Sequence, residues 1–467
     1  MPAYSVPEEK RAFMLNTPVH RLIPRMALPT IASMMVSSLY NLADTWYVSS
    51  LGTLATGAVG INASIDNIIM MTGSFLAMGS GSYASRLLGA KEDDHAIRVL
   101  STCFFSAFFM GLMALIFGSV FQTPLLRLLG ASDAILPYSR QYARYVLLAA
   151  PFMAGSYVLN QCLRAEGSAI YSMIGMVSGA VLNIVLDPIF IFVFGWGVAG
   201  ASAATALSKL VSFSVLISPY LRRRTLLRIS PRFIRYTRGD ALEVIKMGST
   251  SLFRTGFATM AAILLNNLAV RYGESVLAAI SVSNRITFFL TAACLGFGQG
   301  LQPVVGYSWG AKRYDRILQA YRFAVLAAAI GISVPSLLLI IFARPVLFLF
   351  TETDLNMVAV GLFSLRVQCL FMPLHAWGIV VSMSCAGMGR AKGAITLGLS
   401  RQGICLFPIL PLLIYLFGMW GIAVAQGVAD GLNIFLILPI AFMIKRDLKR
   451  LESSGLNSAA QANQFPT

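Results

Sequence analysis

Long apolar stretches, separated by short polar loops, recur along the whole chain. About twelve of them reach the roughly 20 residues that a helix needs to cross a bilayer. They lie near residues 22–48, 56–84, 97–120, 137–162, 168–194, 196–218, 242–268, 277–305, 316–342, 355–386, 394–418 and 419–444. The alternating pattern of a membrane β-barrel is absent, and runs of Leu, Ile, Ala and Phe with interspersed Gly favour helices. The pattern predicts an all-α membrane protein with about twelve transmembrane helices.

Composition excludes a soluble protein. The chain is 57% hydrophobic and 12% charged, with a mean hydropathy of +0.74, whereas soluble domains carry about a quarter charged residues. The six cysteines lack metal-ligand spacing and are interpreted as small hydrophobic residues.

The net charge of +17 is distributed unevenly. Basic residues gather before the first apolar segment, after the second, between the sixth and seventh (222–238), after the eighth and tenth, and at the C-terminus. All these clusters fall on one side if both termini are cytoplasmic, as the positive-inside rule requires. The run at 222–238 is interpreted as a loop near anionic lipid and not as a nucleic-acid site. We therefore expect a multi-pass protein of the inner (plasma) membrane that contacts lipids and binds no nucleic acid.

The second half of the chain repeats the first. Leu88-Gly89-Ala90-Lys91 recurs as Trp309-Gly310-Ala311-Lys312, at an offset of 221 residues, and three further pairs of short motifs, one before it and two after it, recur in the same order. Six helices in each half preserve the topology, so the two bundles are predicted to be parallel repeats. The predicted organisation is a cytoplasmic N-terminal segment (1–21), a first six-helix bundle (22–218), a basic cytoplasmic linker (219–241), a second six-helix bundle (242–444) and a cytoplasmic tail (445–467).

Two aspartates lie inside apolar segments of the first half. A carboxylate in hydrocarbon costs several kcal/mol unless it is protonated, paired or bound to a cation. Under the repeat, Asp44 aligns with Leu265, and Asp187 aligns with Leu410. The scaffold therefore does not need these carboxylates, which makes them candidates for ion chemistry.

Other polar residues share helical faces with the two aspartates. Tyr40 lies four residues before Asp44, and Asn183 four before Asp187, while Thr205 is expected at a similar depth in the next segment. For Asn183 or Thr205 alone, a hydrogen bond within its own helix explains the residue equally well. Two carboxylates at matched depth favour a site for a proton or Na⁺, because both cannot ionise cheaply when they are close. Oxygen ligands from Asp44, Asn183, Asp187 and Thr205 suit either ion.

These residues also carry a resemblance. Asn41-Leu42-Ala43-Asp44-Thr45, Leu163-Arg164-Ala165-Glu166-Gly167 and Asn183-Ile184-Val185-Leu186-Asp187-Pro188 resemble the multidrug and toxic compound extrusion (MATE) transporters, nearest to prokaryotic members of the DinF and MepA type. The resemblance covers about residues 15–445. It implies two six-helix bundles arranged in a V, and antiport of organic cations against H⁺ or Na⁺.

The resemblance also implies roles for individual residues. It assigns a cation network to Asp44, Asn160, Asn183, Asp187 and Thr205, a bending proline to Pro29 and a neighbouring gating tyrosine to Tyr40. Straight helices would separate Asn160 from Asn183 by roughly 14 Å. Some family members place carboxylates in helices 7 and 10, where this chain shows none.

The second half carries intramembrane arginines, namely Arg254, Arg285, Arg366 and Arg401, together with Asp430. In one interpretation they pair with Asp430 and backbone carbonyls or extend to the interfaces. In the other, Arg254, Arg285, Arg401 and Asp430 form an electropositive surface that contacts anionic or zwitterionic substrates.

The leading interpretation is a monomeric secondary antiporter that exports small amphipathic compounds and needs no cofactor beyond its coupling ion. The alternative is a flippase or exporter of anionic, lipid-linked substrates from the same superfamily. An enzyme or an ATP-driven pump is poorly supported, because HExxH, GxSxG and Walker motifs are absent.

Overall fold

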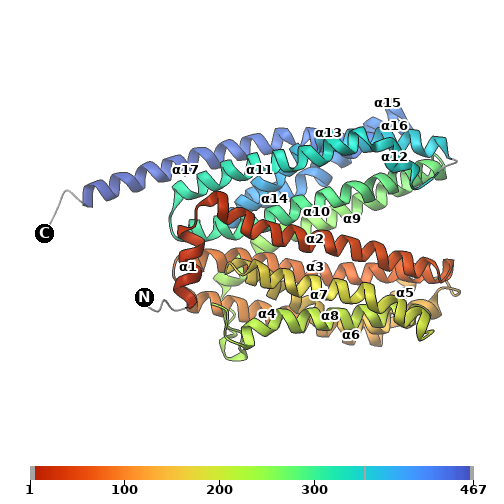
Figure 1. Ribbon diagram of the computed structural model, residues 1–467, viewed down its shortest axis with the longest axis horizontal. Coiled ribbons are helices and arrows are strands. Elements are labelled where there is room, and N and C mark those ends of the chain that lie inside the picture. Colours follow the sequence, from red (N-terminus) through yellow and green to blue (C-terminus); the bar gives the residue numbers. More distant parts are fainter. Residues whose placement is uncertain (1–5, 352–353, 463–467) are drawn as a thin grey trace. The chain divides into compact units, whose positions relative to one another are not determined.

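The computed structural model describes residues 6–351 and 354–462, and every element of regular secondary structure assigned within them is helical. Residues 1–5 and 463–467, at the ends of the predicted terminal segments, lie outside this description. The first repeat contains the helices shown in red to light green in Figure 1. They are α1 (Val6–Asn16), α2 (Val19–Ser49), α3 (Thr53–Gly89), α4 (Asp93–Val120), α5 (Gln122–Leu128), α6 (Leu136–Ala165), α7 (Ala169–Pro188), the π-helical η1 (Ile189–Val193), α8 (Gly197–Leu221) and the 3₁₀ turn η2 (Pro231–Phe233).

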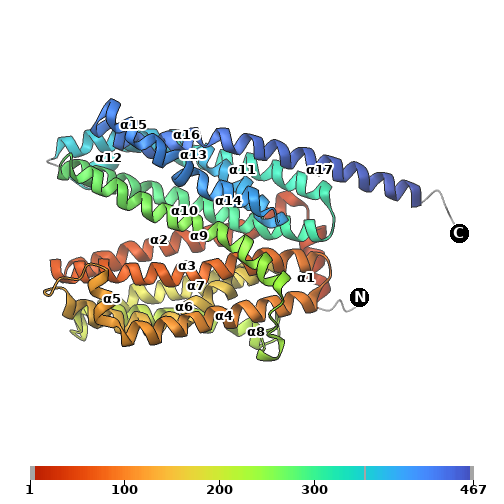
Figure 2. The same cartoon turned by 180° about the vertical axis from the view of Figure 1, so that it is seen from behind.

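The second repeat runs to the C-terminal α17, which continues past the other helices of its unit (Figure 2). Its elements are α9 (Arg238–Val270), α10 (Glu274–Gly310), α11 (Tyr314–Ile341), α12 (Ala343–Phe348), α13 (Leu355–Met388), α14 (Ala391–Leu399), the π-helical η3 (Ser400–Leu406), α15 (Phe407–Phe417), α16 (Met419–Leu432) and α17 (Ile434–Ala462). Eleven of the described helices, counted with their continuations, are long and apolar enough to cross a membrane. The 33-residue α9 stands at the place of the predicted seventh span but is not among these eleven. The predicted all-α membrane fold with about twelve spans is confirmed.

The duplication is visible in backbone geometry. Helices α3 and α10 each contain 37 residues, and α4 and α11 each contain 28, at the offset expected from the sequence. The turn that joins each pair holds a lysine in the left-handed region, with φ of 66° at Lys91 and 57° at Lys312. Positive φ is uncommon for residues other than glycine. The two halves therefore preserve the same turn, and the two-repeat architecture is confirmed.

The chain divides into two compact units, and the first helix of each repeat is split between them. One unit contains residues 1–16 and 28–252, and the other contains residues 17–27 and 253–467. Helix α2 passes from one unit to the other after Ala27, and α9 passes after Leu252. The opening part of each helix thus packs with helices of the other repeat. The segment 219–241 belongs entirely to the first of these units.

Two glycines at equivalent positions of the repeats make this packing possible. A Cβ added to Gly300 of α10 would lie 2.5 Å from the Cα of Ala27 in α2. One added to Gly79 of α3 would lie 2.4 Å from the carbonyl oxygen of Val244 in α9. Small residues allow helix backbones to approach closely in membranes. Here the approach leaves no room for any side chain.

A buried glutamate organises the end of α6. The carboxylate of Glu166 accepts hydrogen bonds from Lys10 Nζ at 3.0 Å and from Ser168 Oγ at 2.8 Å. It also accepts the backbone N–H groups of Leu226 at 2.8 Å and Leu227 at 3.3 Å. Burial raises the pKa of Glu166, while the Lys10 ammonium opposes that shift. The glutamate therefore ties both α1 and the loop after α8 to the end of α6.

Substituting Gly79→Ala or Gly300→Ala should destabilise the protein by about 1–3 kcal/mol, because a methyl group must displace packed backbone. The measurement is the thermal unfolding of each purified variant in detergent. Gly331→Ala in α11 is the matched control, since a Cβ there meets nothing within 4 Å. Wild-type melting temperatures for both Gly79→Ala and Gly300→Ala would contradict the close approach.

Candidate functional site

Helices α7 and α8 bring together three residues of the candidate site. The amide nitrogen of Asn183 donates a hydrogen bond to Asp187 Oδ1 at 3.0 Å and to Thr205 Oγ1 at 3.3 Å. All three side chains are buried. Asn183 and Asp187 share a face because they are one helical turn apart, and α7 packs along α8 with Thr205 toward that face.

The fourth candidate, Asp44, reaches this group from α2. Its carboxyl group lies beside the Asp187 carboxyl group, close enough for the charge of one to act on the other. Two carboxylates in contact cannot both be ionised without a large electrostatic cost. A proton or a cation bound between the two carboxyl groups would remove this cost.

Several oxygen atoms of the group have no hydrogen-bond donor among the residues that the structure describes. They are Asp44 Oδ1, Asn183 Oδ1 and Asp187 Oδ2, and each is shielded from solvent. A buried acceptor without a donor costs about 1–3 kcal/mol. The described chain also holds no group of three or more His, Cys, Asp or Glu residues placed to bind a metal ion. A cation here would depend on amide and hydroxyl oxygens as well as on the carboxylates.

Sequence reasoning missed two charged residues near this group. Lys209 of α8 donates a hydrogen bond to Tyr40 Oη at 3.2 Å, and its ammonium lies 4.9 Å from the centre of the Tyr40 ring. Asp66 of α3 interacts electrostatically with Lys209 and with Asp44. The signal was available, because both residues interrupt apolar segments and intramembrane charges are functional candidates by default.

Asn160 of α6 forms its hydrogen bond with a different part of α7 from the one that carries Asn183 and Asp187. Its side-chain oxygen accepts a hydrogen bond from Ser172 Oγ at 3.1 Å. Ser172 precedes Asn183 by eleven residues in α7, which corresponds to roughly 16 Å along the helix. The described hydrogen bonds thus join Asn160 to the early part of α7 and do not connect it with Asn183 or Asp187.

The predicted bending residue, Pro29, lies within α2, one residue beyond the passage between the two compact units at Ala27 and Leu28. The hydroxyl of Ser33 donates to the Pro29 carbonyl at 2.8 Å. Proline lacks an N–H, so the carbonyl of Arg25 receives no helical hydrogen bond from it. The helix therefore has a local weakness near the point where its packing partners change.

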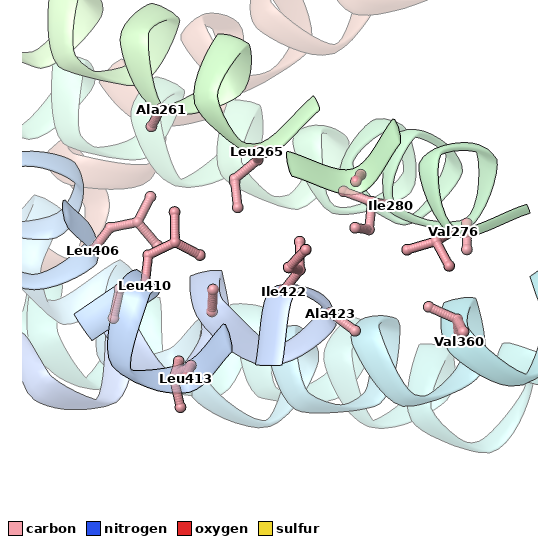
Figure 3. Close-up of a cluster of buried hydrophobic side chains, with 14 of the residues drawn as sticks. Ala261, Leu265, Val276, Ile280, Val360, Leu406, Leu410, Leu413, Ile422 and Ala423 are labelled. Carbon is pink, nitrogen blue, oxygen red and sulfur yellow. The ribbon is translucent and has the colours of Figure 1, made fainter. Parts of the chain in front are cut away.

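In the second repeat, the equivalent positions are apolar and lie together in one buried cluster (Figure 3). Leu265 aligns with Asp44 and Leu410 with Asp187, while the same alignment places Leu406 at Asn183 and Ala261 at Tyr40. The fold thus brings the same positions together in both repeats. In one repeat they form a polar site, and in the other they form hydrophobic core.

The charges of the second repeat form a different arrangement. Asp430 is fully buried. Its carboxylate accepts a hydrogen bond from Arg401 Nη2 at 3.1 Å and forms an ion pair with Arg401 Nε at 2.7 Å. His375 Nδ1 lies 3.3 Å from the same carboxylate. Arg285 is exposed, and Arg254 has no hydrogen bond or ion pair with any described residue. The charge of Asp430 is thus paired locally with Arg401.

The repeated twelve-span scaffold and the buried carboxyl pair define a membrane transporter. The chain belongs to the MATE family, because the family model described as MatE matches residues 29–189 and 252–412. It is 25% identical over 442 residues to the multidrug export protein MepA of Staphylococcus haemolyticus, covering 94% of this chain and 97% of the relative.

Solved structures show the same fold. A MATE protein in its straight conformation superposes with a TM-score of 0.88 at 26% identity, covering 95% of this chain and 99% of that one. A MATE protein in its bent conformation superposes with a TM-score of 0.86 at 25% identity, covering 96% and 99%. The similarity therefore extends over both repeats.

Asp430→Asn should lower the free energy of unfolding by about 3–5 kcal/mol, because it leaves the Arg401 guanidinium without its counter-charge. Thermal unfolding of the purified variant measures the effect. Asp447→Asn is the control, since Asp447 also pairs with an arginine (Arg390, 2.8 Å) but is partly exposed, where an ion pair contributes at most about 1 kcal/mol. Equal melting temperatures for the two variants would show that the Asp430 pair is not structural.

Proposed function

We propose that this protein exports amphipathic organic compounds by antiport against H⁺ or Na⁺. The observation that carries the proposal is the contact between Asp44 and Asp187, with its donor-free oxygens, in one repeat only. The multidrug export named for the MepA relative supports the substrate class. The alternative of a flippase for anionic lipid-linked substrates gains no support from the comparisons.

The carboxyl pair links ion binding to substrate binding, because the substrate favours its ionised state and the coupling ion its neutralised state. When Asp44 and Asp187 are ionised, the first repeat favours a cationic or amphipathic substrate. When a proton or Na⁺ neutralises them, the repulsion disappears and α2 is free to bend near Pro29. A ligand can shift this equilibrium only by its different affinity for the two states. Exchange of ion for substrate therefore drives release.

Helix α2 is suited to this motion. Pro29 removes one backbone hydrogen bond, and prolines are a common cause of helix kinks. The passage between compact units at Ala27 and Leu28 supports a hinge here, as do the straight and bent conformations named for the solved MATE structures. Tyr40 and Asp44 lie beyond the hinge on α2, so bending would move both.

The same proposal includes the setting of the protein. It acts in the inner (plasma) membrane as a monomer surrounded by lipid, with both termini in the cytoplasm, and it binds no cofactor apart from the coupling ion. The basic loop 222–238 and the basic residues Lys445, Arg446, Lys449 and Arg450 in α17 support this orientation.

Asp44→Asn and Asp187→Asn should each abolish gradient-driven export and leave folding intact, because each removes one carboxylate of the pair. The measurement is drug accumulation in an efflux-deficient host, with the H⁺ and Na⁺ gradients collapsed separately. Asp133→Asn is the control, since Asp133 is 90% exposed and paired with Arg127 in a loop. Normal resistance and normal coupling in either site variant would place the coupling site elsewhere.

Pro29→Ala should leave substrate binding near wild type and slow export several-fold, because it restores the missing N–H without touching the carboxylates. Equilibrium binding and efflux rates in proteoliposomes separate the two effects. Pro335→Ala, which removes another proline inside a helix of this chain, is the control. Wild-type efflux in a well-expressed Pro29→Ala protein would remove the hinge from the mechanism.

A further inference from the structure

A lysine lies one helical turn from the candidate cation site. Lys209 and Thr205 are four residues apart in α8 and therefore share a face, as Tyr40 and Asp44 do in α2. The contact between Lys209 and Tyr40 joins these two faces. A basic side chain therefore lies beside the carboxylates that the proposed function assigns to the coupling ion.

The ammonium group of Lys209 is incompletely satisfied. It has three donors, and one of them is used by Tyr40 Oη. No carboxylate of the described residues lies within ion-pair distance of it, although its charge acts on both Asp44 and Asp66. Asp66 Oδ1 is itself shielded from solvent without a described donor. The Lys209 ammonium thus lies near the carboxylates of Asp44 and Asp66 but forms no ion pair with either of them.

The surroundings of Lys209 contain acids and phenols from each neighbouring helix. Tyr40 and Asp44 come from α2, Asp66 from α3 and Tyr157 from α6. On the α7 side, the nearest acid is Asp187, which contacts Asp44. Lys209 supplies the positive charge that acts on Asp44 and Asp66.

Na⁺ fits this group poorly. Oxygen donors from carboxylates, amides and hydroxyls are the right chemical type for a hard cation. However, Na⁺ would have to bind close to an ammonium in a region of low dielectric, where like charges repel strongly. The flexible four-carbon stem of lysine also allows the ammonium to turn toward an ionised carboxylate. A proton avoids this conflict, because it binds one carboxyl oxygen and needs no coordination shell.

We propose that Lys209 is a tethered cation that keeps Na⁺ out of the Asp44–Asp187 site, so that protons alone discharge this carboxylate pair. The inference rests on the proposed function, since it names the coupling ion of the same site. Lys209 acts as a specificity-determining residue for the ion, and its hydrogen bond to Tyr40 holds it in place.

The first experiment measures Na⁺ binding without any substrate. Thermal unfolding of the purified full-length protein is followed as NaCl replaces choline chloride at constant ionic strength. The wild type should show no Na⁺-specific stabilisation. Lys209→Met should gain it, with an apparent Na⁺ affinity at least about tenfold above that of the wild type. Lys209→Arg, which keeps the charge, should remain indifferent to Na⁺.

Two further variants test whether the Na⁺ response belongs to this site and replace Lys209→Met if that variant does not fold. Adding Asp44→Asn to Lys209→Met should remove the gained Na⁺ response, which assigns the response to this site. If Lys209→Met does not fold, Lys209→Gln replaces it. A Na⁺-specific stabilisation of the wild type, or a folded Lys209→Met and Lys209→Gln that both ignore Na⁺, overturns the proposal.

The second experiment measures export in proteoliposomes under either a pH gradient or a Na⁺ gradient. The wild type should respond to the pH gradient alone, and Lys209→Met should acquire a response to the Na⁺ gradient. A Na⁺-driven wild type overturns the role of Lys209. If neither gradient drives export in any variant, the proposed antiport fails, while the binding measurements still decide whether Lys209 excludes Na⁺.

Discussion

A charge inside hydrocarbon must be neutralised, and this requirement shapes both halves of the protein. In the second repeat, the carboxylate of Asp430 forms an ion pair with Arg401, whose Nε lies 2.7 Å away. In the first repeat, Asp44 and Asp187 lie beside each other, and neither forms an ion pair with a described residue. A carboxylate paired with a fixed counter-charge stabilises one arrangement of helices. Two neighbouring carboxyl groups without such a counter-charge respond to an added proton or cation, which is the property that the proposed antiport needs.

The duplicated scaffold separates these two roles. Equivalent positions are brought together in both repeats, yet Leu265, Leu406 and Leu410 fill them with hydrophobic core in the second (Figure 3). The polar residues of the first repeat are therefore not required for packing. The free-energy cost of burying these polar residues is offset by packing in other parts of the fold, including the close helix contacts at Gly79 and Gly300.

The first helix of each repeat connects the site to the rest of the molecule. Helix α2 packs with one compact unit up to Ala27 and with the other from Leu28 onward. Pro29 weakens the helix beside that passage, and Asp44 lies four turns further along. A change in charge at Asp44 therefore acts on a helix that is already divided between two sets of partners. The corresponding division of α9 shows that this is a property of the repeat.

The sequence by itself determined the helical class, the number of spans, the duplication and the two aspartates at matched depth. These features depend on local hydrophobicity and on helical period, which a single chain displays directly. Only the tertiary structure decided that Arg401 and not Arg285 pairs with Asp430, that Asn160 bonds Ser172, and that Lys209 contacts Tyr40. Such contacts depend on how each helix is rotated about its own axis against distant neighbours. That rotation is set by packing between segments far apart in the chain, and no local pattern encodes it.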